Sequence, residues 1–354
     1  MTLTRRVFTA TAAAAIATPA FAAARPAPVI IGHRGASGER PEHTRSAYLL
    51  AIQEGADFIE PDLCLTKDGH MVVRHENEIG GTTNIAAHPE FAARKTAKTI
   101  DGERIEGWFT EDFTLAELKT LRARERLPQV RPASAAFDGT DLILTFEEVV
   151  EIARAETKRT GRTIGVYPEM KHPSYFAGVG LAFEGRMAAA LKAAGLDAKD
   201  APVFVQCFEV APLKTIRPLT RAPLVQLMSL EGGPADNSAV SYAQMATADG
   251  LKAISAYADG VGPEWKMVVP VTDGALAAPT AFVSDAHAAG LKVHPWTVRA
   301  ENIFLPAKLK RGADPAVHGD VDALYDALFK AGVDGLFSDF PGLAVQARTR
   351  FLKA

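Results

Sequence analysis

The sequence predicts an α/β protein of the (β/α)8 TIM-barrel class. Short apolar segments typical of buried strands recur along the chain, at 29–31, 57–62, 163–169, 202–208, 223–229, 258–262, 291–298 and 333–339. Helical patterns lie between these segments. Because strand and helix alternate eight times, a barrel built from strand–helix units is favoured over a doubly wound sheet.

Capping residues mark the ends of the expected helices. A helix is expected directly after Thr44, which is a good N-cap residue. In the next helical segment, Thr145 and Glu148 have the spacing of a capping box, and Gly161 ends the helix. Further helical segments, most of which end on glycine, are 184–195, 279–290, 320–332 and 341–354.

One stretch after the second strand departs from the alternation. A Lys-Asp-Gly turn lies between Leu65 and Met71, and this connection is too short for a crossover helix. We therefore expect a hairpin whose returning arm runs from Met71 to His75. The segment 76–141 has no strong strand pattern and only one short helix, beginning at Thr114, so we interpret it as an insertion over the barrel mouth.

The first residues predict export from the cell. Arg5 and Arg6 precede an apolar run of small residues, and Ala20-Phe21-Ala22 fits a signal-peptidase site. We interpret residues 1–24 as a signal peptide of the twin-arginine type, with an ordinary secretory signal as the alternative. Residues 25–354 would then form a single domain in the periplasm or outside the cell.

Composition excludes several classes of partner. The chain has 39 basic and 42 acidic residues, and removal of Arg5 and Arg6 with the signal leaves 37 basic residues. An acidic balance argues against nucleic acid or an anionic membrane as partner. After the signal, no apolar stretch approaches the ~20 residues that span a bilayer, so stable membrane insertion is not expected.

The chain has two cysteines, Cys64 and Cys207, which are too few for a zinc site. We expect two reduced, packed thiols, with one disulfide as the alternative in an oxidising compartment.

Polar residues gather at the carboxyl ends of the predicted strands, where barrel enzymes keep their active sites. They are His33, Arg34, Glu60, Asp62, His75, Glu169 and Lys171. Residues two apart in a strand share a face, so Glu60 and Asp62 point the same way. Buried carboxylates persist side by side only when a proton or cation compensates them, and Glu169 adds a third. Such hard oxygen ligands suit Ca2+ or Mg2+.

Eight motifs in order resemble those of the glycerophosphodiester phosphodiesterases, particularly the exported type, from about residue 29 to the C-terminus. They are HRGASGERPEHT, GADFIEPDLCLTKDGHMVVRHE, IGVYPEMK, VFVQCFE, LVQLMS, YADGVGP, KVHPWTVR and GVDGLFSDFPG. The resemblance implies a (β/α)8 barrel that uses one divalent cation, with Ca2+ favoured and Mg2+ as the alternative. It implies hydrolysis of glycerophosphodiesters, which are small molecules, to glycerol 3-phosphate and an alcohol.

The resemblance also implies residue roles. Glu60, Asp62 and Glu169 resemble the metal ligands, and His33 and His75 resemble the acid–base pair. The residues that resemble substrate or phosphate contacts are Arg34, Lys171, Glu42, Phe208 and Trp296. Where the family usually has aspartate after the second histidine, this chain has Glu76.

Two other functions fit parts of the pattern. One is a related phospholipase D-like lipid phosphodiesterase, and the other is a non-catalytic protein that captures phosphodiesters. The presence of two histidines beside three carboxylates favours catalysis, because a capture protein has no need of proton transfer. The oligomeric state and the attacking group, either water or the substrate's own 2-hydroxyl, stay open.

Overall fold

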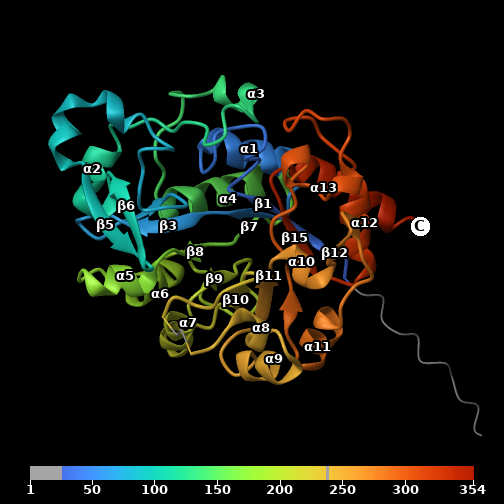
Figure 1. Ribbon diagram of the computed structural model, residues 1–354. Coiled ribbons are helices and arrows are strands. Elements are labelled where there is room, and N and C mark those ends of the chain that lie inside the picture. Colours follow the sequence, from blue (N-terminus) through green and yellow to red (C-terminus); the bar gives the residue numbers. More distant parts are fainter. Residues whose placement is uncertain (1–25, 237–238) are drawn as a thin grey trace, which may run out of the picture.

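Parallel strands occupy the centre of the fold, and helices surround them in a TIM-barrel-like α/β arrangement (Figure 1). The computed structural model describes residues 26–236 and 239–354. The predicted signal peptide at 1–24 lies outside the described residues. Within the described part of the chain, no helix has the length and apolar character needed to cross a membrane.

The central strands coincide with the eight predicted apolar segments. They are β1 (Val29–His33), β2 (Phe58–Glu60), β3 (Asp62–Leu65), β7 (Gly165–Val166), β8 (Glu169–Met170), β9 (Val205–Cys207), β10 (Leu224–Met228), β11 (Gly260–Pro263), β14 (Lys292–Val293) and β15 (Gly335–Ser338). One sheet has the order β15-β1-β2-β7, and the other has the order β14-β11-β10-β9-β8-β3-β4. Backbone hydrogen bonds also run from Val298 N to Phe337 O (2.9 Å) and from Phe337 N to Pro295 O (3.0 Å).

Two predicted strands are each divided into two shorter ones. Pro61 separates β2 from β3, and Pro168 lies between β7 and β8. Proline has no backbone N–H to give to a strand ladder, which accounts for both interruptions. Because the two halves of each divided strand belong to different sheets, these prolines also mark where one sheet passes into the other.

The helices form where the capping residues predicted them. The Thr44 side chain accepts a hydrogen bond from Ala47 N, and Thr145 and Glu148 form a capping box. Gly161 ends the same helix with a φ of 70°. The helices of the barrel region are α1 (Arg45–Gln53), α4 (Phe146–Thr160), α5 (Pro173–Gly178), α6 (Glu184–Ala193), α7 (Val210–Ile216), α8 (Tyr242–Met245), α9 (Ala248–Ile254), α10 (Trp265–Val268), α11 (Phe282–Ala288), α12 (Val321–Lys330) and α13 (Pro341–Phe351).

Shorter elements complete this region. The 3-10 helices are η4 (Arg217–Leu219), η5 (Asn302–Phe304) and η6 (Ala307–Leu309), and β12 (Val271–Thr272) pairs with β13 (Ala275–Leu276). Cys64 and Cys207 are both buried with free thiols, in agreement with the expected reduced state.

The region after the second strand contains more structure than the sequence indicated. Strand β3 pairs antiparallel with β4 (Met71–Val73), and His75 follows β4. The next elements are η1 (Ile85–Ala87), η2 (Pro89–Arg94), β5 (Thr96–Ile100), β6 (Glu103–Gly107), η3 (Thr110–Asp112), α2 (Leu115–Leu118) and α3 (Pro132–Ala135). We expected no strands here, and the β5–β6 hairpin corrects that expectation. Its strands are mostly exposed and polar, so they lack the apolar alternation of a half-buried strand.

Aromatic and aliphatic side chains fill the interior enclosed by the strands. Ile31, Tyr167, Val225 and Phe337 form a fully buried cluster there. His294 is buried against this cluster, and a hydrogen bond of 2.9 Å joins its Nδ1 to the Tyr167 hydroxyl. Burial lowers the pKa of His294 to about 4. The folded protein therefore holds this imidazole neutral at a pH where an exposed one would be protonated.

We expect the stability of the protein to fall in mild acid because of His294. Between pH 6.5 and about 4, the unfolded state binds a proton at this residue that the folded state does not bind, so the free energy of unfolding falls as pH decreases. Replacing His294 by Gln should reduce that slope by up to about 1.4 kcal/mol per pH unit. Urea denaturation of both proteins at several pH values measures the slope, and an identical slope would contradict the prediction.

Candidate active site

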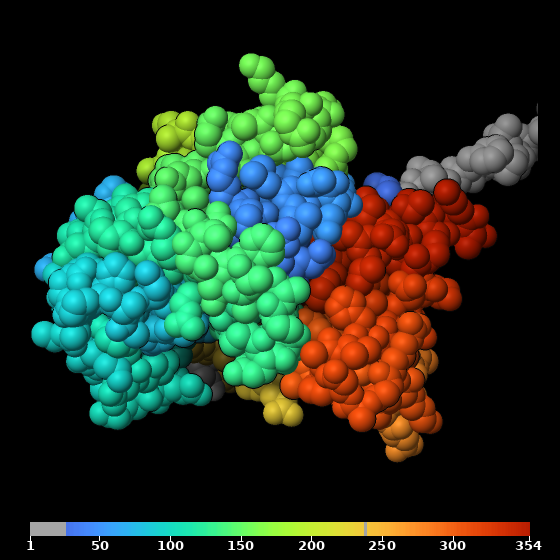
Figure 2. Space-filling view, turned by 90° about the horizontal axis from the view of Figure 1, so that it is seen from above, coloured from blue at the N-terminus to red at the C-terminus, as the bar shows by residue number. Residues whose placement is uncertain are grey.

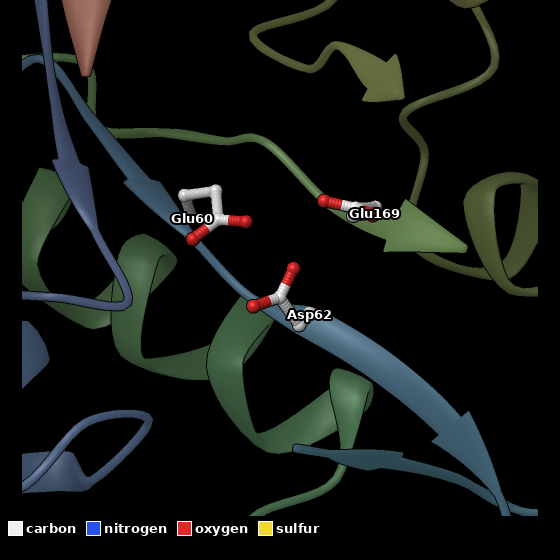
Figure 3. Close-up of side chains that lie close together, drawn as sticks. All are labelled: Glu60, Asp62 and Glu169. Carbon is white, nitrogen blue, oxygen red and sulfur yellow. The ribbon is translucent and has the colours of Figure 1, made fainter. Parts of the chain in front are cut away.

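Three acidic side chains meet where the second and third predicted strands lie side by side. Glu60 ends β2, Asp62 begins β3, and Glu169 begins β8, where Asp62 and Glu169 are register partners. One oxygen of each carboxylate lies within 4.8 Å of the other two, and all three residues are buried. Figure 3 shows Glu60 and Asp62 on one continuous stretch of chain with Glu169 opposite them. The predicted cluster is therefore present.

Hydrogen bonds fix the positions of these carboxylates. Glu60 accepts bonds from Arg34 N (2.8 Å) and Gln206 Nε2 (3.1 Å). Asp62 lies 2.9 Å from His43 Nε2, and Lys171 Nζ lies 2.9 Å from Glu169 Oε1. Each carboxylate thus has at least one donor beside it, and the donor to Glu169, Lys171, lies two residues further along the same segment.

The cluster is electrostatically strained in the absence of a cation. Burial, reinforced by the charges of Asp62 and Glu169, raises the pKa of Glu60 well above its usual range. Burial raises the pKa of Glu169 to about 8, even though Lys171 lowers it. The pKa of Asp62 is held well below its usual range, because nearby His75, Lys171, His43 and Arg34 outweigh its burial. A positive charge placed among the three would relieve the repulsion.

His33 is held in one orientation at the end of β1. Its Nδ1 lies 2.6 Å from Asp339 Oδ1, just after β15. Burial, together with the charge of Arg34, lowers the pKa of His33 to about 4. With its Nδ1 proton donated to Asp339, a neutral imidazole carries its lone pair on Nε2.

His75 has a similar carboxylate partner. Its Nδ1 lies 2.5 Å from Glu76 Oε1, so the glutamate that replaces the family's aspartate still reaches the ring. Its Nε2 lies 3.4 Å from Lys171 Nζ. Burial and the charges of Arg34 and Lys171 lower the pKa of His75 to about 3. In both histidines, Nδ1 therefore lies against a carboxylate oxygen.

A cavity of about 460 Å3 brings most of the predicted site residues together. The predicted residues that line it are His33, Arg34, Glu42, Glu60, His75, Glu169, Lys171, Phe208 and Trp296. Asp62 is not among the lining residues and lies behind the cavity wall, 3.2 Å from Arg34 Nε. Trp296 and Phe208 pack edge to face with centroids 5.5 Å apart, and the Trp296 indole N–H donates to Gly262 O. The cavity thus has one apolar wall and one charged wall.

Glu42 forms ion pairs with two arginines, unlike a side chain that is free to contact substrate. Its Oε2 accepts a hydrogen bond from Arg34 Nη1 (2.9 Å), and its Oε1 accepts one from Arg126 Nη2 (2.6 Å). The arginine charges hold the pKa of Glu42 well below its usual range against the effect of burial. Glu42 therefore orients two cationic side chains toward the cavity.

The sequence alone did not single out several residues of the cavity wall. They are Arg126, Arg131, Gln206, Arg299 and Asp339. Arg131 bonds Glu301 Oε1 and Asp339 Oδ2, each at 2.6 Å, and Arg299 Nε lies 3.0 Å from the same Asp339 oxygen. Asp339 belongs to the quoted motif GVDGLFSDFPG, which was the one available signal for it. No periodicity could have indicated the two arginines of the inserted region.

The inserted region contributes directly to this cavity. Seen from above in Figure 2, it forms a lobe, coloured cyan to green, and its green end lies next to the orange and red C-terminal residues. The bonds of Arg131 to Glu301 and Asp339 span that contact. Residues 76–141 therefore supply part of the wall of the cavity.

Sequence comparisons with known proteins all indicate one enzyme family. The sequence model of the glycerophosphoryl diester phosphodiesterase family matches residues 33–343. A glycerophosphodiester phosphodiesterase of Arabidopsis thaliana is 37% identical over 327 residues, which cover 89% of this chain and 84% of that protein. A glycerophosphodiester phosphodiesterase of Haemophilus influenzae is 32% identical over 345 residues, which cover 90% of this chain and 89% of that protein.

Solved structures show the same fold. A putative glycerophosphoryl diester phosphodiesterase from Silicibacter pomeroyi superimposes with a TM-score of 0.64 at 19% identity, covering 92% of this chain and 94% of that one. An Oleispira antarctica phosphodiesterase, solved with the product sn-glycerol-3-phosphate, gives a TM-score of 0.56 at 22% identity, covering 90% of this chain and 96% of that one. Because the family's sequence model and its relatives match most of the chain, the chain belongs to the glycerophosphoryl diester phosphodiesterase family and is an enzyme of that class, a phosphoric diester hydrolase.

Proposed function

We propose that the protein hydrolyses glycerophosphodiesters, the deacylated forms of phospholipids, to glycerol 3-phosphate and an alcohol with the help of one divalent cation. The observation that carries the proposal is a cluster of three buried carboxylates at a cavity lined by two of them, by two carboxylate-paired histidines and by several cationic side chains. We further propose that residues 25–354 act as one eight-stranded barrel domain, with 76–141 inserted over its mouth.

The acidic cluster fits a hard divalent cation. Glu60, Asp62 and Glu169 would hold it, and burial and mutual repulsion raise the pKa of Glu60 and Glu169 when it is absent. Oxygen ligands of this kind suit Ca2+ or Mg2+, and the resemblance to the exported members of the family favours Ca2+. When bound, the cation would offset negative charge on the phosphoryl oxygens in the transition state.

Removal of divalent cations should abolish hydrolysis, and Ca2+ or Mg2+ should restore it. Independently of activity, Ca2+ at about 100 times its Kd should stabilise the fold by about 2.7 kcal/mol. Asp62→Asn and Glu169→Gln should lose this stabilisation, whereas Glu151→Gln, on the exposed face of α4, should keep it. Thermal unfolding with and without Ca2+ measures the effect. Full activity of the metal-stripped protein would reject the metal site.

The cationic side chains of the cavity provide binding for the phosphodiester. Arg34 and Lys171 are buried and lie on either side of the acidic cluster, where Arg34 contacts Asp62 and Lys171 contacts Glu169. Guanidinium and ammonium groups bind phosphate oxygens through charge-assisted hydrogen bonds. Phe208 and Trp296 form the apolar wall, which we assign to the glycerol carbons.

His33 and His75 provide proton transfer. One takes the proton of the attacking hydroxyl, and the other gives a proton to the leaving alkoxide through Nε2. Asp339 and Glu76 hold the rings in place through Nδ1, as positioning residues. A bound phosphodiester would also add negative charge beside two imidazoles whose pKa values are now lowered by burial and by neighbouring cations, and this would favour their protonated forms.

Alanine at either histidine should lower turnover by roughly 100-fold or more, because proton transfer by a positioned side chain contributes about that factor. The matched control is His70→Ala, since His70 is half-exposed in the turn between β3 and β4. Steady-state kinetics and circular dichroism of the three variants separate lost chemistry from lost folding. A variant of His33 or His75 with near-normal turnover would remove that residue from the mechanism.

The substrate class separates this function from the two alternatives. A phospholipase D-like enzyme would act on intact phospholipids, and a capture protein would bind diesters without turnover. Arginine, lysine and histidine side chains line the cavity beside its apolar wall, which suits the anionic phosphate and short carbon chain of a water-soluble diester. Hydrolysis of glycerophosphocholine in the absence of activity on phosphatidylcholine vesicles would support the proposal over both.

We also propose export to the periplasm or the exterior, supported by Arg5, Arg6 and the small-residue site at Ala20–Ala22. Replacing both arginines by Lys retains the charge but removes the twin-arginine feature. In a bacterial host, the parent enzyme should appear in the periplasm and the double variant should stay in the cytoplasm. Unchanged export of the variant would indicate an ordinary secretory signal, and cytoplasmic retention of the parent would reject export.

A further inference from the structure

A second cavity, of about 390 Å3, lies next to the catalytic one. Glu169, Lys171 and Phe208 line both cavities, so these three side chains form the wall between them. The other walls come from the turn between β5 and β6, the start of α5, the residues after β9 and β10, and α8. A diester whose phosphate is held by Lys171 therefore has a second hollow beside it.

The charge of the second cavity differs from that of the first. Arginines surround the catalytic cavity, whereas Asp101, Glu169 and Glu209 line the second one. Its two cationic residues already have partners, because Lys171 pairs with Glu169 at 2.9 Å and His172 with Asp101 at 2.6 Å.

Glu209 is the third carboxylate of the second cavity. In the described part of the chain, no cationic side chain forms an ion pair with it. It is 3% exposed and is held by hydrogen bonds from the Ser174 N–H and hydroxyl. Burial, together with the charges of Asp101 and Asp236, raises the pKa of Glu209 to about 7, even though the hydrogen bonds from Ser174 lower it. A cation at this position would relieve the repulsion between Glu209 and these two aspartates.

Aromatic rings complete this cavity. Phe208 and Tyr242 line it and pack edge to face, with centroids 6.2 Å apart. Aromatic faces attract organic cations, most strongly where water is excluded. A buried carboxylate beside aromatic rings is the combination that recognises quaternary and primary ammonium groups.

We propose that the second cavity binds the leaving alcohol of the substrate and selects one that carries a positive charge, an amino alcohol. The inference rests on the proposed diester hydrolysis. The anionic phosphate would lie among the arginines and Lys171, and the cationic end would lie beyond Phe208 near Glu209. Asp101 ties the inserted region to this selection, because the β5–β6 turn carries it to His172.

A matched pair of substrates tests the charge requirement. Glycerophosphocholine and the glycerophosphodiester of 3,3-dimethylbutanol have the same shape, and only the first is cationic at the head group. With the Ca2+-loaded full chain, kcat/KM should favour the choline diester by about tenfold, a typical factor for a partly desolvated cation–π site. In Glu209→Gln, which keeps the hydrogen bonds to Ser174, the preference should fall at least about threefold, with kcat/KM for the neutral diester little changed.

Two further variants complete the test, one at a second residue of the cavity and one as a control. Asp101→Asn preserves the positive φ of 47° that asparagine tolerates and removes one of the two carboxylates paired with His172, the other being Glu76, so it should also reduce the preference. Glu151→Gln makes the same chemical change far from either cavity and should leave the preference intact. Equal kcat/KM for the two diesters in the parent, or an unchanged ratio in both cavity variants, would overturn the inference.

A binding measurement separates this inference from the proposed function. Calorimetry should show that choline binds the parent several-fold more tightly than it binds Glu209→Gln, and that 3,3-dimethylbutanol binds both alike. Choline binding without hydrolysis of any diester would reject the proposed function and retain the cation site. Hydrolysis of both diesters without choline binding would reject the cation site and retain the proposed function.

Discussion

Three buried carboxylates held within one small volume are the constraint on which the rest of the site depends. Like charges at this separation repel strongly when water is excluded, so the fold must surround them with donors and cations. The backbone N–H of Arg34 and the ring of His43, both from the loop between β1 and α1, meet that need together with the amide of Gln206 in β9 and the ammonium of Lys171 after β8. The cluster thereby ties the ends of several strands together, as well as supplying ligands for a cation.

Asp339 has a comparable role on the opposite side of the cavity. One of its oxygens faces His33, and the other accepts bonds from Arg131 and Arg299. The pKa of this carboxyl is held well below its usual range, because the arginine and histidine charges outweigh its burial. Because Asp339 stays ionised, it can hold the His33 ring in one tautomer. Arg131 bonds the other oxygen of the same carboxylate.

The two cavities divide the charge of the site in a way that suits a dipolar ligand. Arginine and lysine side chains gather where an anion would bind, and carboxylates and aromatic rings gather beyond Phe208. The inserted region contributes to both sides, through Arg126 and Arg131 at the first cavity and Asp101 at the second. A segment that adds nothing to the central strands therefore supplies residues to both cavities.

The central strands, the capped helices and the acidic cluster could be predicted from the sequence, because they follow from local rules of periodicity, capping and alternation. Thr145 with Glu148 and the Glu60–Asp62 pair are examples whose partners lie within a few residues along the chain. The tertiary structure alone decided which distant groups meet, since Arg131 reaches Asp339 across 208 positions and Gln206 reaches Glu60 across 146. It also decided that Glu209 has no cationic partner among the described residues, because pairing of charges depends on distances in space that no local pattern records.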